Sequence, residues 1–375
     1  MTVQLVNGFL KEQEKKKRLD EFNELPSLTV NQDVALEMDK IAVGAFSPIT
    51  GFPVKEDYLS ILKEGRLSNG SPFPIPVTLD VHRDDAKNLE EKSLIGIKEA
   101  SGKPLGLLSL EEKYAHDKAD RSLRVFGVNE LKHPGVTFVH NSNDLLLGGK
   151  VSLFKRPDFE FLDHDLTPEQ TRELFKKRGW KTITGFQTRN VPHRAHEHQQ
   201  KVALQLTDGL FIHPLIGWKK KGDFHPSAII RGYEALIKHY YPSNNVVFST
   251  LTTIMRYAGP KEAVFHALIR RNYGCTHFVV GRDHAGVHGY YDKYAAHKIF
   301  EKYPDLGIEP LLFKGAYYCK RCASTVTEQI CPHTGKDIIE ISGTDIRNFV
   351  TKREPVPSEL MRPEVSASLS EKDII

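Results

Sequence analysis

The residues best suited to chemistry lie in one segment, Gln187–Glu197. It gathers guanidinium, imidazole, amide and hydroxyl side chains: Gln187, Thr188, Arg189, Asn190, His193, Arg194 and His196. An apolar run precedes the segment and a helical pattern follows it, which predicts a loop leading from a strand into a helix N-terminus. Such an end attracts anions, and arginine suits phosphate or sulfate oxygens. The segment therefore predicts an anion site, with a solvated basic helix start as the alternative.

A second stretch, Gly281–Gly286, reads Gly-Arg-Asp-His-Ala-Gly and follows another apolar run, Thr276–Val280. The first segment resembles the QTRN-x-x-HRAH signature of the ATP sulfurylase (sulfate adenylyltransferase) family, and the second is identical to that family's GRDHAG signature. The stretches Ala45–Phe52 and Ile341–Arg347 resemble further family landmarks. By this resemblance the chain is identified as a member of the family.

The resemblance implies a reaction of MgATP with sulfate that gives adenosine 5′-phosphosulfate and diphosphate. A sulfate oxygen would attack the α-phosphorus in line, without a covalent enzyme intermediate. The nucleophile is already an anion, so the chemistry needs positioning and electrostatic stabilisation rather than a general base.

The resemblance also implies a role for each residue that matches a motif. The expected catalytic residues are Thr188, Arg189, Asn190, His193 and His196, with the two histidines stabilising charge in the transition state. The expected substrate-binding residues are Gln187, Arg189, Arg282 and Ala285. The expected nucleotide-binding residues are Gln187, Thr188, Arg189, Asn190, Gly281, Arg282, Asp283, His284 and Ala316.

Some positions depart from the family pattern or carry weaker signals. Val191 stands between Asn190 and Pro192, and His288 interrupts the usual continuation after GRDHAG. His288 is interpreted first as a solvated loop histidine, because histidines are often partly exposed. The basic run Lys219–Asp223 either draws anions toward the crevice or is an exposed loop. Arg256 lies in a stretch that resembles a family loop beside the nucleotide.

A cluster of thiols predicts a zinc site. The pattern Cys319-x2-Cys322-x8-Cys331-x-His333 offers three sulfurs and one imidazole. Four such ligands would form a closed, structural Zn²⁺ site, and Cys-x-x-Cys is a well-specified half of one. His333 is the least secure ligand because Cys-x-His is a tight spacing, and free loop thiols are the alternative.

The elements that must position these residues fall into three expected domains: 1–155, 156–314 and 315–375. Strands and helices alternate after residue 155, which predicts a Rossmann-like α/β domain with a parallel sheet and ligands at the carboxyl ends of its strands. Helices are expected at 226–240, 260–273 and 291–303. By resemblance this is the H-x-x-H nucleotidyltransferase domain, and the Rossmann dinucleotide and P-loop fingerprints are absent from the sequence.

The first domain is expected to be β-rich, and the resemblance makes it PUA-like. After a helix capped by Asn31, strands are expected at 75–81, 93–98, 105–110, 136–140 and 151–154. The last domain carries the zinc knuckle and a helix beginning near Thr344, and the tail from Glu354 is expected to fray.

The net charge and the distribution of apolar residues limit the possible functions. A net charge of +4 across 375 residues is too mild to indicate nucleic acid. Without a long apolar run or a signal peptide, we expect a cytoplasmic protein that spans no membrane. The resemblance also implies a homo-oligomer, with a dimer favoured. Because no P-loop is present, a separate adenylylsulfate kinase or reductase would consume the product.

Two other functions stay open. Another nucleotidyltransferase of the H-x-x-H superfamily would use a different acceptor, although the segment Gln187–Asn190 favours a sulfate-sized anion. An RNA-binding protein built on the PUA-like domain and the knuckle would bind RNA in a salt-sensitive way, which we do not expect.

Overall fold

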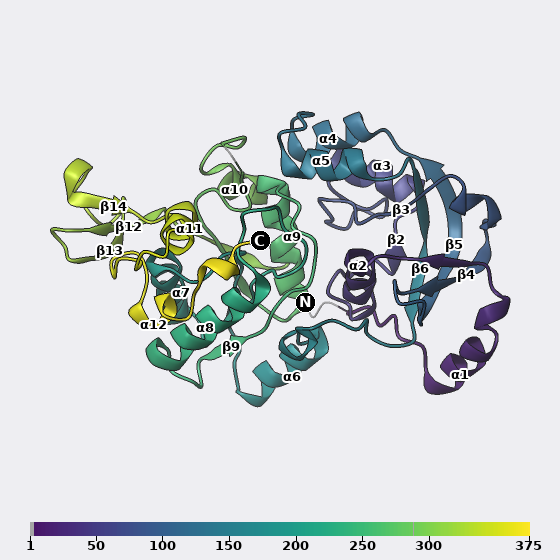
Figure 1. The fold of residues 1–375 in the computed structure, drawn as a ribbon, viewed down its shortest axis with the longest axis horizontal. Helices are drawn as coiled ribbons and strands as arrows, with labels where there is room; N and C mark the ends of the chain where they lie inside the picture. Colours follow the sequence, from purple (N-terminus) through teal and green to yellow (C-terminus); the bar gives the residue numbers. More distant parts are fainter. Residues whose placement is uncertain (1–3, 288) are drawn as a thin grey trace.

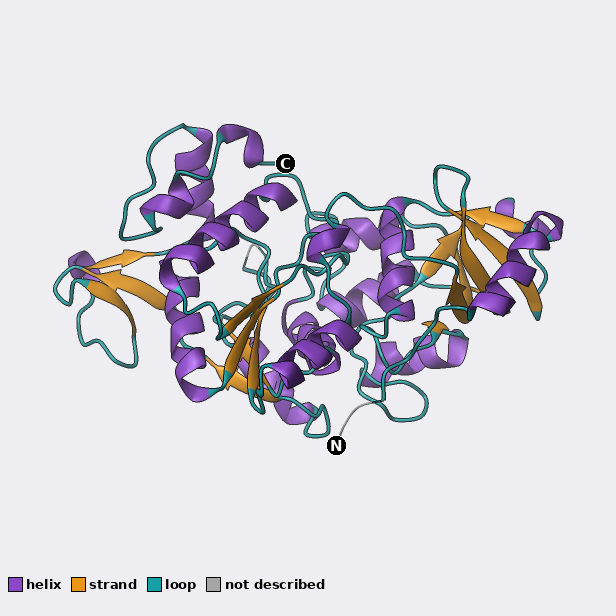
Figure 2. Cartoon of the chain, turned by 90° about the horizontal axis from the view of Figure 1, so that it is seen from below, coloured by secondary structure: helices purple, strands orange, loops and turns teal. Residues whose placement is uncertain are grey.

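The computed structural model describes residues 4–287 and 289–375; His288 therefore lies outside the described residues. The molecule is elongated, with the N-terminal residues in one lobe and the later residues in another (Figure 1). Three groups of strands follow one another along the long axis (Figure 2). Among the described residues, no helix is long and apolar enough to cross a lipid bilayer.

The N-terminal lobe is built on a six-stranded sheet in the order β1-β4-β5-β6-β2, with β3 also paired to β6. All of its pairs are antiparallel except β1 with β4. The strands are β1 (Ser27–Thr29), β2 (Gly51–Phe52), β3 (Leu79–Val81), β4 (Ser93–Lys98), β5 (Pro104–Ala115) and β6 (Leu145–Leu153). The helices are α1 (Glu12–Asp20), α2 (Gln32–Ala42), α3 (Lys55–Glu64), α4 (Lys118–Phe126) and α5 (Pro134–Asn141), with 3-10 turns at Phe22–Glu24 and Asp85–Asn88.

One predicted strand is wrong. The β-branched stretch 136–140 lies in helix α5, because His133 accepts the N–H groups of Gly135 and Val136 and Pro134 occupies the first turn. The predicted cap of α2 is confirmed, since the Asn31 side chain accepts the Val34 N–H. Local capping chemistry therefore overrode β propensity at α5.

The second lobe contains a five-stranded sheet whose pairs are all parallel, in the order β11-β10-β7-β8-β9. Its strands are β7 (Ile183–Phe186), β8 (Gly209–Ile212), β9 (Val246–Phe248), β10 (His277–Val280) and β11 (Glu309–Leu312). Its helices are α6 (Pro168–Lys177), α7 (Arg194–Leu206), α8 (Pro226–Tyr240), α9 (Gly259–Asn272) and α10 (Ala295–Lys298), with 3-10 turns at Leu162–His164 and Ile299–Lys302. The predicted alternation of strands and helices is confirmed.

The C-terminal part forms a small antiparallel sheet of β12 (Ala316–Cys319), β13 (Ser324–Thr327) and β14 (Ile338–Glu340), followed by α11 (Gly343–Thr351) and α12 (Pro363–Ser366). Ser342, not Thr344, caps α11 by accepting the Asp345 N–H. Short 3-10 turns lie at Gly335–Asp337 and Glu371–Asp373. The expectation of a frayed tail is also wrong, because Met361 and Val365 are fully buried against the second lobe.

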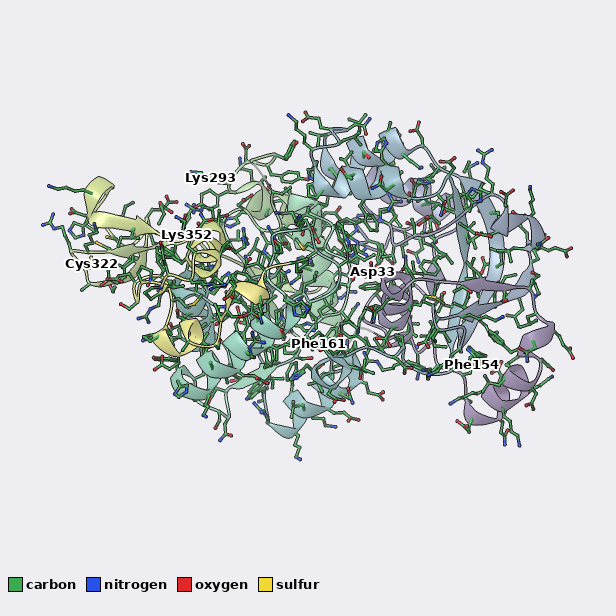
Figure 3. The ribbon with its side chains drawn as sticks, in the orientation of Figure 1. Asp33, Phe154, Phe161, Lys293, Cys322 and Lys352 are labelled. Atoms are coloured by element: carbon green, nitrogen blue, oxygen red, sulfur yellow. The ribbon has the colours of Figure 1, made fainter. Side chains whose placement is uncertain are left out.

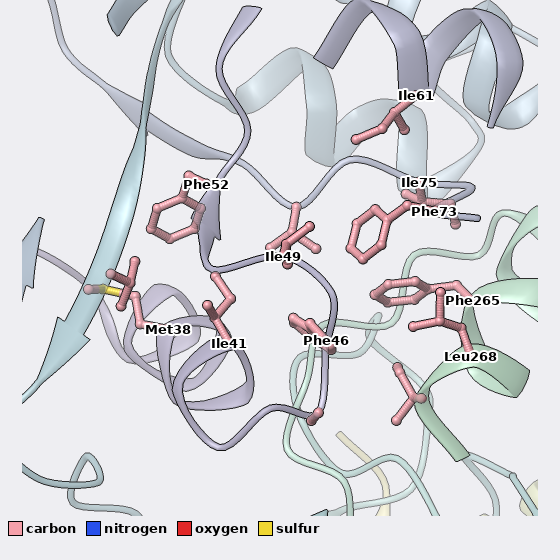
Figure 4. Packing of buried hydrophobic residues seen from close by; sticks show 14 of the residues in the cluster. Met38, Ile41, Phe46, Ile49, Phe52, Ile61, Phe73, Ile75, Phe265 and Leu268 are labelled. Atoms are coloured by element: carbon pink, nitrogen blue, oxygen red, sulfur yellow. The ribbon is translucent and has the colours of Figure 1, made fainter. Parts of the chain in front are cut away.

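The two lobes share one hydrophobic core. Phe46 and Phe73 of the first lobe pack on Phe265 of α9, with ring centroids 5.3 and 5.6 Å away (Figure 4). Each such buried aromatic contributes about 1.5–3 kcal/mol by leaving water. This packing fixes α9, and α9 in turn lies behind the loop that follows β10.

Candidate active site

A crevice opens at the carboxyl ends of strands β7 and β10, where the two signature loops converge. Its cavity volume is about 320 Å³. Every residue expected to serve catalysis, substrate or nucleotide lines it: Gln187, Thr188, Arg189, Asn190, His193, His196, Gly281, Arg282, Asp283, His284, Ala285 and Ala316. The parallel sheet explains this meeting, because loops after adjacent strands leave the same edge.

The two histidines form a stacked pair at the start of α7. His193 is the N-cap, and its Nδ1 accepts the His196 backbone N–H at 3.3 Å. The ring centroids lie 3.6 Å apart with an interplanar angle of 22°. Burial lowers the pKa of His193 to about 3, and burial together with His193 holds the pKa of His196 well below its usual value. Without a ligand, both rings are therefore neutral at pH 7.

Arg189 lies in the crevice with only a loose set of partners. Its Nε is 3.5 Å from the buried Asp223 carboxylate, and Nη2 donates to the Gly286 carbonyl at 3.4 Å. The guanidinium also lies over the Tyr257 ring, 5.1 Å from the centroid. Its enclosed Nε makes no hydrogen bond. Arg189 is thus oriented, but part of its hydrogen-bonding capacity is left over.

Arg194, the other arginine of the first signature, points away from the crevice. It donates to the Ser358 carbonyl at 2.9 Å and to Glu197 at 3.4 Å, and it does not line the cavity. The prediction that both arginines serve the anion site is therefore wrong for Arg194. It fastens the C-terminal tail to the start of α7 instead.

The third wall comes from the C-terminal part. Arg347 donates to Asn190 at 3.1 Å and lies 3.7 Å from Asp223, so it closes one side of the crevice. Arg282 lies 3.3 Å from Glu340 at the end of β14, and both side chains are partly exposed. The crevice therefore presents three guanidinium groups that share few carboxylates.

The second signature loop bends sharply. Asp283 and Ala285 adopt φ values of 54° and 55°, the left-handed region that costs about 1–2 kcal/mol for a residue with a Cβ. A Cβ on Gly286 would lie 1.8 Å from the Asp283 carboxylate, so any other residue here would have to displace the Asp283 side chain. Left-handed residues in such a turn direct backbone N–H groups inward, as in anion-binding nests.

Sequence reasoning missed several residues around the crevice. Gln199 lines it, and its position one helical turn beyond His196 was the available signal. Lys219 and Asp223 are buried, so the interpretation of 219–223 as an exposed loop is wrong for these two. Lys219 donates to the Phe224 carbonyl at 2.6 Å, and burial lowers its pKa to about 7.

Arg256 does not line the crevice. It pairs with Glu37 of α2 and donates to the Ile254 carbonyl at 2.7 Å, so it joins the two lobes. The suggested place beside the nucleotide is therefore not supported for its side chain.

The predicted metal ligands lie together beyond the third wall. The ligand atoms of Cys319, Cys322, Cys331 and His333 all lie within 4.8 Å of one another. The Cys322 and Cys331 sulfurs are 3.7 Å apart, and His333 Nδ1 lies 3.4–3.5 Å from each sulfur. A tetrahedral zinc with bonds of ~2.3 Å to sulfur and ~2.0 Å to nitrogen separates its donors by roughly 3.5–3.8 Å. The donor set fits such an ion, and Cys322 lies in the turn between β12 and β13 at one end of the molecule (Figure 3).

Comparison with known proteins supplies the family. The family model "ATP-sulfurylase" matches residues 163–372. The chain belongs to the ATP-sulfurylase family. A second model, "PUA-like domain", matches residues 1–156, which agrees with the β-rich N-terminal lobe. The expected boundaries at 155 and 314 stay predictions, since the first two expected domains share a core.

Curated relatives match over nearly the whole chain. "Sulfate adenylyltransferase" of Ignicoccus hospitalis is 47% identical over 362 residues, 96% of this chain and 94% of the relative. That of Staphylothermus marinus is 48% identical over 370 residues, 98% and 97% of the two chains. A solved structure, "Hexameric APS kinase from Thiobacillus denitrificans", superposes with a TM-score of 0.77 at 22% identity. It covers 97% of this chain but only 66% of its own, and at this identity it shows the fold alone.

Proposed function

We propose that this protein is a sulfate adenylyltransferase, which joins ATP and sulfate into adenosine 5′-phosphosulfate and diphosphate or catalyses the reverse. The observation that carries the proposal is the convergence of both signature loops on one crevice rich in guanidinium groups. The printed names of relatives that cover nearly the whole chain agree with it. No comparison favours a nucleotidyltransferase with a different acceptor.

Sulfate would bind at Arg189, with Gln187 and the Ala285 backbone beside it. The unused hydrogen-bonding capacity of Arg189 supports this position, since the site otherwise holds an arginine with an unsatisfied Nε. Tyr257 and the buried Asp223 keep the guanidinium in place. A bound dianion would therefore meet a cation that needs little reorganisation.

The triphosphate of MgATP would lie against the histidine pair. Because His193 Nδ1 accepts a backbone N–H, the ring hydrogen of neutral His193 is on Nε2, which leaves Nε2 as a donor. Thr188 and Asn190 would stand near the α-phosphorus, while Gly281, Arg282, Asp283, His284 and Ala316 would hold the nucleotide. Developing negative charge on the phosphates would then meet donors already in place.

The four ligands of the Cys/His cluster would hold a structural Zn²⁺. A closed ligand set leaves no open position for substrate, so the ion would brace the sheet rather than react. Strand β12 begins at Ala316 in the crevice and ends at Cys319, and β14 carries Glu340, the partner of Arg282. The cluster would thereby fix one wall of the crevice.

Zinc analysis tests the proposed Zn²⁺ site. Protein purified without chelator should contain equimolar zinc, and Cys322→Ser should lower both zinc content and the melting temperature. Cys275→Ser, a buried thiol outside the cluster, is the matched control for zinc content. The assignment would be refuted if Cys322→Ser kept its full zinc content. It would also be refuted if only the control, Cys275→Ser, lost its zinc.

The remaining expectations complete the proposal. We expect a cytoplasmic homo-oligomer, a dimer in preference, whose product passes to a separate adenylylsulfate kinase or reductase. Gel filtration with light scattering measures the oligomeric state.

Sulfate-dependent release of diphosphate from MgATP tests the function. We expect release with sulfate, release of AMP when molybdate replaces sulfate, and little release with neither anion. Diphosphate release that ignores both anions would refute the proposal and favour a different acceptor.

A further inference from the structure

Three side chains form a row of close polar contacts from the interior to the crevice. Glu262 and His266 lie one helical turn apart on α9, and both are buried. His266 Nε2 is 3.4 Å from the Glu262 carboxylate, and His266 Nδ1 is 3.2 Å from Nε2 of His284. His284 lines the crevice, so the row ends where ligands bind.

Glu262 is held as a carboxylate at the buried end of the row. Its two oxygens accept the backbone N–H groups of Arg256 at 2.8 Å and Ala258 at 2.9 Å. Although burial opposes ionisation, His266 and these hydrogen bonds hold the pKa of Glu262 below its usual value. A carboxylate can only accept, and it faces Nε2 of His266 at 3.4 Å, so it favours the His266 tautomer with hydrogen on Nε2.

The hydrogen on Nε2 of His266 determines the tautomer of His284. Burial keeps the pKa of His266 low, so the ring is neutral and its Nδ1 carries a lone pair. Nδ1 of His266 can then only accept, and the hydrogen between the two histidines belongs to His284 Nε2. Each ring is therefore confined to the tautomer with hydrogen on Nε2.

The surroundings of His284 favour the neutral ring. Burial is the main reason that its pKa lies well below the usual value, and the positive charges of Arg270 and Arg189 lower it further. Nδ1 of His284 makes no hydrogen bond to a described residue, yet it is not among the enclosed polar atoms that lack a partner. It is therefore accessible from the crevice as a bare acceptor.

We propose that Glu262 and His266 are positioning residues that fix His284 as a hydrogen-bond acceptor for a hydroxyl or amino group of the nucleoside. This inference rests on the proposed function for the identity of the ligand. A bare imidazole nitrogen repels phosphate oxygens, which also only accept. His284 thus differs from His193, whose available nitrogen donates, and it recognises the nucleoside rather than the triphosphate.

The tautomer can be read without any substrate. Long-range proton–nitrogen spectra of the protein carrying isotope-labelled histidine should show His284 with Nε2 protonated and Nδ1 bare at neutral pH, with the signal assigned by its loss in His284→Gln. A spectrum with the hydrogen on Nδ1, or a doubly protonated ring, overturns the inference even if the enzyme is active. Conversely, the expected spectrum in a protein without sulfate-dependent diphosphate release would fault the proposed function instead.

A matched pair of variants separates positioning from simple packing. In His266→Asn the amide oxygen can replace Nδ1 as the acceptor for His284, whereas His266→Leu removes it. We expect His266→Asn to keep the His284 tautomer and a KM for ATP within about threefold of the wild-type value. We expect His266→Leu to mix tautomers and raise that KM about tenfold. Equal KM values in two folded variants would overturn the positioning role, and if His266→Leu does not fold, the wild-type spectrum still decides.

Nucleotide analogues identify the donor. The arms are 2′-deoxyATP, 3′-deoxyATP and a triphosphate of purine riboside, which lacks the amino group. In the wild-type enzyme one arm should lose roughly ten- to a hundredfold in kcat/KM relative to ATP. That difference should vanish in His284→Ala, where no acceptor is left. If every arm loses as much in His284→Ala as in the wild type, no nucleoside donor contacts His284 and the inference is wrong.

Discussion

Two regions of this molecule carry buried charge, and they treat it in opposite ways. At the seam between the lobes, Lys40 lies 2.9 Å from Asp39 and 2.6 Å from Asp165, and Arg156 lies 2.8 Å from both carboxylates. In the crevice, the closest ion pairs of Arg189 and Arg347 are at 3.5 and 3.7 Å, and they share the single carboxylate of Asp223. At the seam each cation has close carboxylate partners, whereas in the crevice the guanidinium groups outnumber the carboxylates that pair with them.

The seam therefore contributes to stability, whereas the crevice is suited to binding an anion. Cations matched by fully buried carboxylates fix the position of one lobe on the other, and removal of one partner leaves a buried charge uncompensated. Cations held in place but undersatisfied attract an anion of the right size. Substitutions in the two regions should therefore change different measurements.

The largest effect is expected at the seam. Lys40→Met leaves two buried carboxylates with Arg156 as their one cationic partner among the described residues, and it should lower the free energy of unfolding by about 3–5 kcal/mol. Urea denaturation measures this. Lys63→Met, at an exposed ion pair with Glu64, is the matched control and should change it by less than ~0.5 kcal/mol. Equal effects of the two substitutions would show that the seam does not hold the lobes together.

The next effect is expected in the crevice and on activity. Arg189→Ala should lower kcat/KM for sulfate by roughly 10²–10³-fold, because it removes the central cation of the anion site. Its melting temperature should fall little, since the buried Asp223 carboxylate keeps Arg347 and the Tyr257 hydroxyl as partners. Arg194→Ala, from the same signature but outside the crevice, should keep kcat/KM within a few-fold. Comparable losses of activity in both variants would contradict the assignment.

A smaller effect is expected on the stability of the protein at acidic pH. His193 stays neutral in the folded protein down to about pH 3, whereas an unfolded histidine binds a proton near pH 6.5. The unfolded state therefore binds more protons below pH 6.5, so stability falls as the pH is lowered from there. His193→Asn, which can still cap α7, should flatten this fall by up to about 1.4 kcal/mol per pH unit. Denaturation curves at roughly pH 7 and pH 5 test it, and an unchanged slope would refute the buried neutral ring.

The smallest effect is expected where the crevice meets solvent. Glu340→Gln removes the partly exposed partner of Arg282, and such pairs contribute about 0–1 kcal/mol. Stability should stay within that range, while the KM for ATP should fall slightly because Arg282 loses a competing anion. Steady-state kinetics at low ionic strength measures it, and a higher KM would mean that Glu340 positions Arg282 rather than competing for it.

The sequence predicted the meeting of the two loops because both follow strands, and the carboxyl ends of parallel strands share an edge. It also predicted the metal cluster from cysteine spacing. It did not predict Asp223 under Arg189 or the row from Glu262 to His284, since such contacts depend on how helices pack far along the chain. Arg194 was misassigned because a single helical turn places successive residues on different faces. The strand expected at 136–140 failed because a histidine cap outweighed side-chain propensity.

The two signature loops are proposed to hold a nucleotide phosphate and a tetrahedral oxyanion side by side. A crystal structure with adenosine 5′-phosphosulfate would show both groups at once. We expect sulfuryl oxygens within hydrogen-bond reach of Arg189 and the Ala285 N–H, and the α-phosphate against His193 and His196. A sulfuryl group that contacts none of these residues, with the nucleotide well ordered, would contradict it.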